Sequence, residues 1–192
     1  MRRQVWDLTV TNRNAHLAES DPLPYSTAMS YGLRTIAGGM VELCDECGFD
    51  ARLVSDHGSA VATAITSLDD MTDRVDSARR PDTDTFSADE YAAHCVETTV
   101  GLLGYIAQVT GRPLARSITD LAGCAELASG VLAELSDLDR LGVLSGVFPF
   151  DLTVNGIVLH LLHDLEHHVL DVRRGYARLA MADHPAVYTV ER

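Results

Sequence analysis

A stretch near the C-terminus concentrates side chains that could bind a metal ion. Between His160 and Asp171 the sequence holds four histidines and two aspartates among aliphatic residues. Two pairs, Asp164 with His168 and His163 with His167, are spaced four residues apart, so each pair shares one face of a helix. Imidazole and carboxylate groups bind divalent cations. The stretch therefore predicts a metal site, because so many ionisable groups on a half-buried helix lose hydration unless something pairs with them.

The two pairs differ in their position around the expected helix. At about 100° per residue from His160, the aliphatic side chains centre at roughly 130°, which defines the buried face. Asp164 and His168 fall at about 40° and 80°, whereas His163 and His167 fall at about 300° and 340°. We therefore expect Asp164 and His168 as ligands and His163 and His167 as an alternative pair, turned toward solvent. The alternative pair resembles the His-Glu-x-x-His motif of zinc peptidases, but the shorter Asp164 stands where that motif has the Glu that acts as general base.

A metal site inside a helical bundle also needs a ligand from a facing helix, and His94 is the candidate. His94 follows two alanines and shares a helix side with Tyr91 and Thr98, which places it toward the core. A lone half-buried histidine is more often a hydrogen-bonded core residue than a ligand. The histidines of the later stretch favour the metal interpretation. His160 could be a spare ligand, a hydrogen-bond donor to a ligand, or simply a histidine at a helix interface.

The four cysteines form one close pair and two isolated residues. Cys44 and Cys47 make a Cys-x-x-Cys motif, which supplies half a zinc site or a redox pair. No thioredoxin-like β-α-β pattern follows it. The alternatives are a thiolate pair that takes His57 or another histidine as a further ligand, and a thiol pair that only packs. Isolated cysteines on core faces are most simply buried apolar residues; these are Cys95 and Cys124.

Helical spacing of apolar residues recurs in four segments that must position these side chains. The segments are 50–78, 87–110, from 117 or 119 to 142, and from 151 or 153 to about 180. Ser87-Ala-Asp-Glu90 is a capping box at the start of the second segment. Because the links are short and no period-two strand pattern appears, we predict an all-α fold, a four-helix bundle.

The two ends of the chain lack this periodicity. Asparagine, proline and glycine interrupt residues 1–39, which we expect to be a flexible extension before an alternative start at Met40. A short helix from Ser26 to Ile36 is the alternative. The predicted division is an extension over 1–39, a bundle over 40–182 and a tail over 183–192.

Composition limits the classes of partner. The chain has 192 residues, 46% of them hydrophobic, which is enough for one core. A net charge of −13 and a pI near 4.8 argue against nucleic acid or anionic membranes as partners. No apolar run follows the basic start or reaches membrane-spanning length, and four cysteines without a signal peptide do not form a disulfide framework. We therefore expect a cytoplasmic protein with small-molecule partners.

Three motifs resemble those of the DinB-like superfamily. Phe86-Ser-Ala-Asp-Glu-Tyr-Ala-Ala-His94 resembles its Trp-Ser-x-x-Glu-Tyr-x-x-His motif at the start of the second helix, with Phe86 in place of the usual Trp. The stretch from Leu162 to Arg173 resembles its last-helix signature. Cys44-x-x-Cys47-Gly-Phe-Asp is similar to the opening of an actinobacterial-looking branch. The resemblance covers residues 40 to about 178, and the link between the second and third helices is short for the family.

The resemblance implies a fold, a metal and a reaction class. The superfamily includes mycothiol-dependent maleylpyruvate isomerase and the bacillithiol and mycothiol S-transferases. Its plan is an up-down-down-up four-helix bundle that holds a divalent metal, here by His94, Asp164 and His168, with Asp171 as a hydrogen-bond partner to the ligands. Asp164 is one methylene shorter than the Glu that this branch often has. Zinc is the expected metal, with nickel or manganese as alternatives.

The implied chemistry uses a low-molecular-weight thiol. Two imidazoles and a carboxylate leave coordination positions open, where a bound thiol or water is acidified. The resemblance implies mycothiol or a similar thiol as co-substrate, in S-transfer to a small electrophile or its isomerisation. Arg173 and Arg174 could hold a carboxylate of the thiol or substrate, although arginines late in a helix also complement its dipole.

A second hypothesis belongs to another class. Fold alone does not imply an activity, and many bundles have no assigned reaction. The alternative is a non-enzymatic metal-binding helical bundle, a homodimer, that acts as a stress-response or interaction module. Metal content and thiol-dependent turnover distinguish the two hypotheses.

Overall fold

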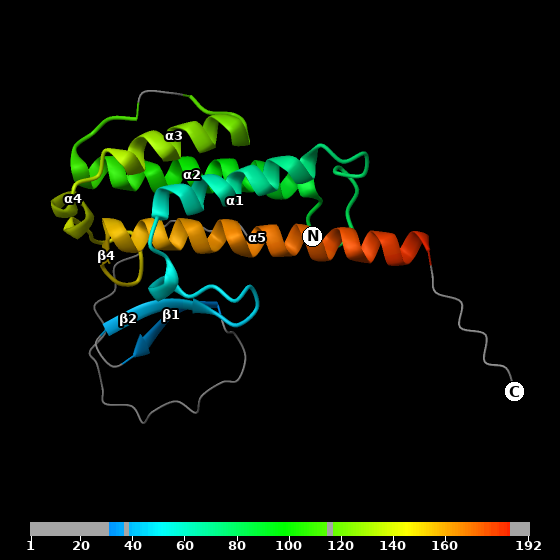
Figure 1. The fold of residues 1–192 in the computed structure, drawn as a ribbon, viewed down its shortest axis with the longest axis horizontal. Coiled ribbons are helices and arrows are strands. Elements are labelled where there is room, and N and C mark those ends of the chain that lie inside the picture. Colours follow the sequence, from blue (N-terminus) through cyan, green and yellow to red (C-terminus); the bar gives the residue numbers. More distant parts are fainter. Residues whose placement is uncertain (1–30, 37–38, 115–116, 185–192) are drawn as a thin grey trace, which may run out of the picture.

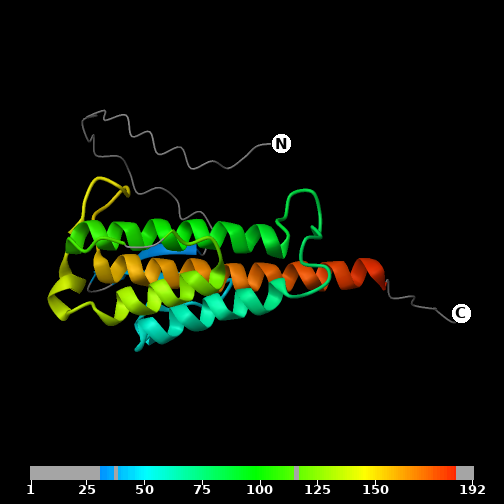
Figure 2. The same cartoon turned by 90° about the horizontal axis from the view of Figure 1, so that it is seen from above.

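Helices dominate the structure. The computed structural model describes residues 31–36, 39–114 and 117–184. Figure 1 shows four long helices side by side: α1 (His57–Thr72), α2 (Ala88–Thr110), α3 (Leu121–Ala133) and α5 (Val154–Asp183). Helices α1 and α5 run in one direction and α2 and α3 in the opposite one, as Figure 1 and Figure 2 show. Helices α1 and α2 each pack against both α3 and α5. The prediction of a mainly helical protein is confirmed.

Each long helix begins where a side chain caps its first turn. Ser87 and Glu90 form the predicted capping box, in which each side chain accepts a hydrogen bond from the other residue's backbone N–H. Asp56, Asp120 and Thr153 each accept a hydrogen bond from the backbone N–H three residues later. These caps set the start of the helices that carry the candidate ligands.

Two helices are shorter than predicted. The helix expected over 50–78 begins only at His57, because Asp50 accepts a hydrogen bond from the Arg52 backbone and starts a separate 3-10 turn, η1 (Ala51–Leu53). The helix expected to continue to residue 142 ends at Ala133. A second capping box, between Ser136 and Asp139, there starts the short helix α4 (Asp137–Leu141).

The segment before α1 contains a hairpin that the sequence did not indicate. Strand β1 (Tyr31–Ile36) pairs antiparallel with β2 (Gly39–Cys44), with Tyr31 opposite Cys44. The alternative helix is therefore wrong over residues 31–36, which form a strand, and the division into an extension and a bundle stays a prediction. Residues 1–30 lie outside the described part. A second, two-residue pairing joins β3 (Val143–Leu144) to β4 (Leu152–Thr153) before α5. The predicted tail is described only as far as residue 184.

Helix α5 lies between the other long helices and the hairpin. Its predicted apolar arc is buried throughout, at Val154, Ile157, Val158, Leu161, Leu162, Leu165, Val169 and Val172. Strand β2 contacts α5, and Figure 1 shows the hairpin on the side of α5 opposite the other long helices. Helix α5 therefore has two covered faces, and each one can carry buried polar side chains.

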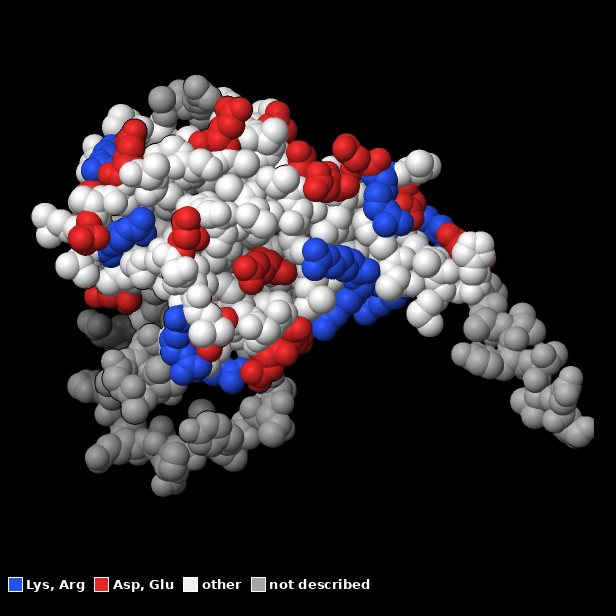
Figure 3. All heavy atoms as spheres, in the orientation of Figure 1, with Lys and Arg blue, Asp and Glu red and all other residues white. Residues whose placement is uncertain are grey.

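The surface carries both signs of charge. Figure 3 shows acidic and basic side chains interspersed over one face of the molecule. Several form ion pairs, such as Arg79 with Asp183 at 2.6 Å and Arg178 with Asp82 at 3.1 Å. Among the described residues, no helix combines the length and apolar character needed to cross a membrane.

Candidate metal centres

The three predicted ligands come together between α2 and α5. One ligand atom each from His94, Asp164 and His168 lies within 4.8 Å of the others, close enough for a single ion. The rings of His94 and His168 stand edge to face, with centroids 5.1 Å apart. We call this group the histidine–carboxylate site. Helix α2 supplies His94, and α5 supplies the other two from successive turns, as the wheel predicted.

Neighbouring side chains hold the two imidazoles of this site. The Tyr91 ring lies 5.0 Å from the His168 ring, between centroids. The Thr98 hydroxyl lies 3.4 Å from Nε2 of His94, one turn along α2. Asp171 Oδ2 is 3.3 Å from Nδ1 of His168, where we expected a hydrogen-bond partner. The His168 ring is therefore fixed from two sides, and its other nitrogen faces Asp164.

The electrostatics of this site favour a protonated His168 beside an ionised Asp164. A divalent cation could take the place of that proton. Burial acts against protonation of His168, but the carboxylates of Asp164 and Asp171 outweigh it and raise the pKa of His168 to about 9. Burial likewise raises the pKa of Asp164, but His168 and His94 lower it more. Nε2 of His168 is buried, 3.5 Å from Asp164 Oδ1, and makes no hydrogen bond within the described chain. The two imidazoles of His94 and His168 and the carboxylate of Asp164 form a donor set that fits a divalent metal.

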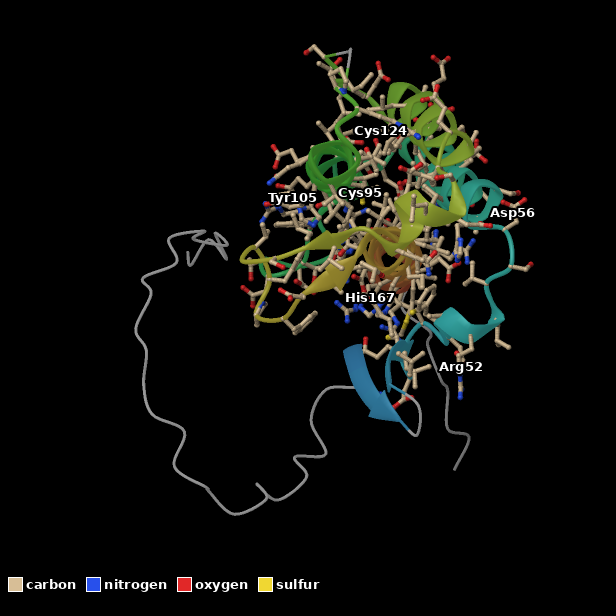
Figure 4. The ribbon with its side chains drawn as sticks, turned by 90° about the vertical axis from the view of Figure 1, so that its left-hand side faces the viewer. Arg52, Asp56, Cys95, Tyr105, Cys124 and His167 are labelled. Atoms are coloured by element: carbon tan, nitrogen blue, oxygen red, sulfur yellow. The ribbon has the colours of Figure 1, made fainter. Side chains whose placement is uncertain are left out.

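A second group of ligand-type side chains joins the hairpin to α5. Cys44, Cys47, His163 and His167 each have one ligand atom within 4.8 Å of the others. We call this group the cysteine–histidine site. Cys44 Sγ lies 3.6 Å from Nδ1 of His167. Figure 4 shows His167 on the side of α5 that faces the hairpin, whereas Cys95 and Cys124 lie among the helices. The described residues thus contain two groups that could each hold a metal ion.

The chain around Cys44 makes a tight turn. Gly48 donates a backbone hydrogen bond to the Cys44 carbonyl at 3.0 Å, and Cys44 donates one to the Phe49 carbonyl at 2.9 Å. Gly48 has φ +79°, a left-handed conformation that suits glycine. Burial acts to raise the pKa of the Cys44 thiol, but backbone hydrogen bonds from Cys47 and Glu46 and the His163 side chain lower it to about 6. Burial raises the pKa of Cys47 to about 11.

A buried carboxylate that the sequence analysis missed supports this second group. Glu42 on β2 is 3% exposed, and its Oε1 lies 2.6 Å from Nδ1 of His163 and 2.9 Å from Nδ1 of His160. Burial raises the pKa of Glu42, but the two histidines lower it by more. Burial lowers the pKa of both histidines, whereas Glu42 raises it, and the pKa of each lies above its ordinary value. The sequence does contain a signal for this buried carboxylate, because Glu42 is the one acidic residue in the otherwise apolar run Met40-Val-Glu-Leu.

The expectation that His163 and His167 face solvent is wrong. The His163 side chain is fully buried and stacks on the Phe49 ring with centroids 4.8 Å apart, and the His167 side chain is 15% exposed. The wheel placed this pair opposite the aliphatic arc, and the hairpin covers that side of α5. His57, which we considered as a partner for the cysteines, instead lies beside Arg140, 3.5 Å from its guanidinium.

The predicted substrate-binding arginine lies on another face. Arg173 is exposed and lines a pocket of about 450 Å³ between α1 and α5, together with Cys47 and Glu166. The lining of that pocket does not include the histidine–carboxylate site. Arg174 instead pairs with Glu46 at 3.2 Å, beside the Cys44 turn. A substrate role for Arg173 stays a prediction.

Comparison with known proteins assigns neither a family nor a function to the chain. No family model, no curated protein and no solved structure matches the chain.

Proposed function

We propose that this protein is a DinB-like four-helix bundle that performs divalent-metal-dependent chemistry on a low-molecular-weight thiol. The observation that carries the proposal is the convergence of His94, Asp164 and His168 from two helices separated in sequence. The order of helix directions, with α1 and α5 opposed to α2 and α3, supports the bundle type. The sequence motifs of α2 and α5 supply the family resemblance.

His94, Asp164 and His168 would hold the metal, with zinc expected and nickel or manganese as alternatives for this nitrogen and oxygen donor set. A bound divalent metal acidifies a coordinated thiol, so that thiolate is available near neutral pH. Asp171 keeps the His168 ring oriented through Nδ1, as carboxylates behind metal-binding histidines do. Tyr91 limits the movement of the same ring. The reaction proposed is S-transfer from mycothiol or a similar thiol to a small electrophile, or isomerisation of that electrophile.

One observation favours the second candidate, a metal-binding bundle without turnover. The side chains of Asp164 and His168 are each only 16% exposed. A ligand pair this enclosed leaves little surface for a thiol and an electrophile to reach the same ion. A stress-response or interaction role in a homodimer would need the metal but no open coordination position.

Metal content and thiol-dependent turnover test the proposal together. Metal is measured in the purified wild type and in His94→Ala and His168→Ala, with His184→Ala as control, because His184 is exposed at the end of α5. Conjugation of monochlorobimane is then followed with and without mycothiol. We expect each site variant to lose one equivalent of metal and the thiol-dependent rate, and the control to keep both.

The other outcomes are equally decisive. Metal that depends on His94, without any thiol-dependent rate, supports the non-enzymatic module. Metal content that is unchanged in both site variants contradicts both candidates, since each depends on this site.

A further inference from the structure

We propose that Cys44, Cys47, His163 and His167 form a closed, tetrahedral zinc site that fastens the N-terminal hairpin to α5. This inference is independent of the proposed function, which concerns the histidine–carboxylate site. The four residues come from two segments: the end of β2 with the turn that follows it, and the middle of α5. Their donor set, two thiolates and two imidazoles, is the Cys₂His₂ set of structural zinc sites.

The separations of the four groups approach those of a tetrahedral ion. With zinc–sulfur bonds of ~2.3 Å and zinc–nitrogen bonds of ~2.0 Å, a sulfur and a nitrogen on the same ion lie roughly 3.5 Å apart. Cys44 Sγ and His167 Nδ1 lie 3.6 Å apart, and all four ligand atoms lie within 4.8 Å of one another. A contraction by small side-chain rotations is enough to close the set around one ion.

The spacing within each segment also fits zinc. Two residues separate Cys44 from Cys47 and three separate His163 from His167, which matches the C-x₂-C and H-x₃-H halves of Cys₂His₂ sites. The halves lie far apart in the sequence, unlike those of a zinc finger. Packing of the hairpin against α5 brings the two halves together. The tertiary fold therefore brings together ligands that a zinc finger carries close together in its sequence.

The turn around Cys44 brings the two thiols close to each other and to α5. Its backbone is closed by two hydrogen bonds, from the Gly48 amide to the Cys44 carbonyl and from the Cys44 amide to the Phe49 carbonyl. The left-handed Gly48 lets the chain reverse directly after Cys47. Both thiols therefore come from one short turn and lie within 4.8 Å of each other.

Carboxylates orient both histidines for coordination. Glu42 lies 2.6 Å from Nδ1 of His163, which directs that ring's Nε2 away from the carboxylate. For His167 the arrangement is reversed, with Nδ1 toward Cys44 and Nε2 3.7 Å from Glu46 and 3.9 Å from Asp171. Metal-binding histidines characteristically use the second ring nitrogen in this way. The site has four protein ligands and so leaves no position for substrate, which fits a structural role.

The donor set makes the site distinguishable by spectroscopy, because the histidine–carboxylate site contains no sulfur ligand. Full-length protein, purified under reducing conditions, is loaded with zinc for X-ray absorption and with cobalt(II) for optical spectra. We expect a zinc–sulfur shell at ~2.3 Å, and for cobalt a sulfur-to-metal charge-transfer band with strong tetrahedral d–d bands. Protein that binds metal through nitrogen and oxygen alone overturns the proposal.

Three variants assign the ligands. The double variant Cys44→Ser/Cys47→Ser removes both sulfur ligands and should lose one equivalent of zinc and the charge-transfer band. Cys124→Ala is the matched control, because it removes a buried cysteine that lies between α2 and α3, and it should keep the band. His94→Ala should also keep the band while losing the metal of the other site. A band that persists in the double cysteine variant, or disappears in His94→Ala, contradicts the assignment.

Limited proteolysis tests the fastening role without relying on a variant that folds poorly. Zinc is removed from His94→Ala by a chelator, and cleavage between residues 31 and 44 is followed by mass spectrometry. We expect cleavage there to accelerate at least tenfold and to return to its original rate when zinc is restored. Equal rates with and without zinc would overturn the role. Recovery of Cys44 and Cys47 as a disulfide from anaerobically purified, zinc-free protein would instead support a redox pair.

Discussion

Asp171 lies between the two candidate centres. Its Oδ2 is 3.3 Å from Nδ1 of His168 and 3.9 Å from Nε2 of His167. One carboxylate therefore hydrogen-bonds a ligand of the first group and lies near a ligand of the second. Residues in this position affect metal affinity without touching the ion, because they fix the ring orientation and raise the basicity of the ligand.

We expect Asp171→Asn to weaken metal binding at the histidine–carboxylate site by about 10- to 100-fold. The amide keeps the shape of the side chain but removes the charge that faces His168. Competition with a chromophoric chelator measures the affinity. Asp183→Asn, at the exposed end of α5, is the matched control and should bind as the wild type does. Equal affinities for the two variants would exclude this role for Asp171.

Glu42 is the buried acid on which two histidines depend. In Glu42→Gln the neutral amide no longer balances His160 and His163, so we expect the free energy of unfolding to fall by about 1–3 kcal/mol. Urea unfolding of the metal-free protein measures this loss. Glu97→Gln, an exposed position on α2, should change little. A variant as stable as the wild type would mean that the pairs with Glu42 contribute no net stability.

At the scale of helices and strands, the capped start of α2 positions His94 about two turns later. Glu90 accepts hydrogen bonds from the Ser87 backbone and from Arg80, and it closes the capping box. Arg80, followed by the Ser87 backbone, lowers the pKa of Glu90 from 4.5 to about 2. A carboxyl group whose pKa is lower in the folded state stabilises that state when it is ionised.

This shift gives a pH dependence of known sign. The contribution of Glu90 is complete above pH 4.5 and is lost as pH falls toward about 2, because protonation then removes the charge. Wild type should therefore melt higher than Glu90→Gln at pH 7, by an amount that corresponds to about 1 kcal/mol. The gap should narrow steadily below pH 4.5 in calorimetry at a series of pH values. A gap that stays constant down to pH 3 would contradict this account.

The sequence predicted helices better than strands, for a physical reason. Helical hydrogen bonds are local, so the caps and the apolar spacing of α2 and α5 predict those helices within a few residues. The strand β1 depends on β2 for its hydrogen bonds, and the interruptions before Met40 hide that pairing. The error at α3 has a local origin: Ser136 begins a new capping box inside an otherwise helical pattern.

At the scale of the whole molecule, one apolar core holds the long helices together. Leu161, in the middle of α5, is fully buried. We expect Leu161→Ala to lower the free energy of unfolding by ~2–5 kcal/mol, because the side chain leaves a cavity that the helices fill only in part. Leu138→Ala, at a position that is 79% exposed, should stay within about 0.5 kcal/mol of the wild type. Urea unfolding of both variants measures the difference.

The two candidate sites also differ in how far the sequence predicts them, because one depends on spacing within helices and the other on contacts between distant segments. His94, Asp164 and His168 converge as their spacing on two amphipathic helices predicts, and their role as ligands stays a prediction. The meeting of Cys44 and Cys47 with His163 and His167 was not predictable from the wheel of α5. It depends on a hairpin packing against the side of that helix that carries few aliphatic residues.

Helix α5 directs neighbouring residues toward different partners, because adjacent side chains lie about 100° apart around the helix. His163 and Asp164 are adjacent, as are His167 and His168, yet the first of each pair joins the hairpin group and the second joins the α2 group. A single inserted residue within this turn would rotate everything after it by about 100°. An insertion between Asp164 and His167 would place Glu166 where His167 now lies, and His167 where His168 now lies. The cysteine–histidine site would then lose one of its two α5 ligands, whereas the histidine–carboxylate site would still have a histidine in place. The adjacent pair His167 and His168 therefore makes the second site less sensitive than the first to a change in the length of this turn.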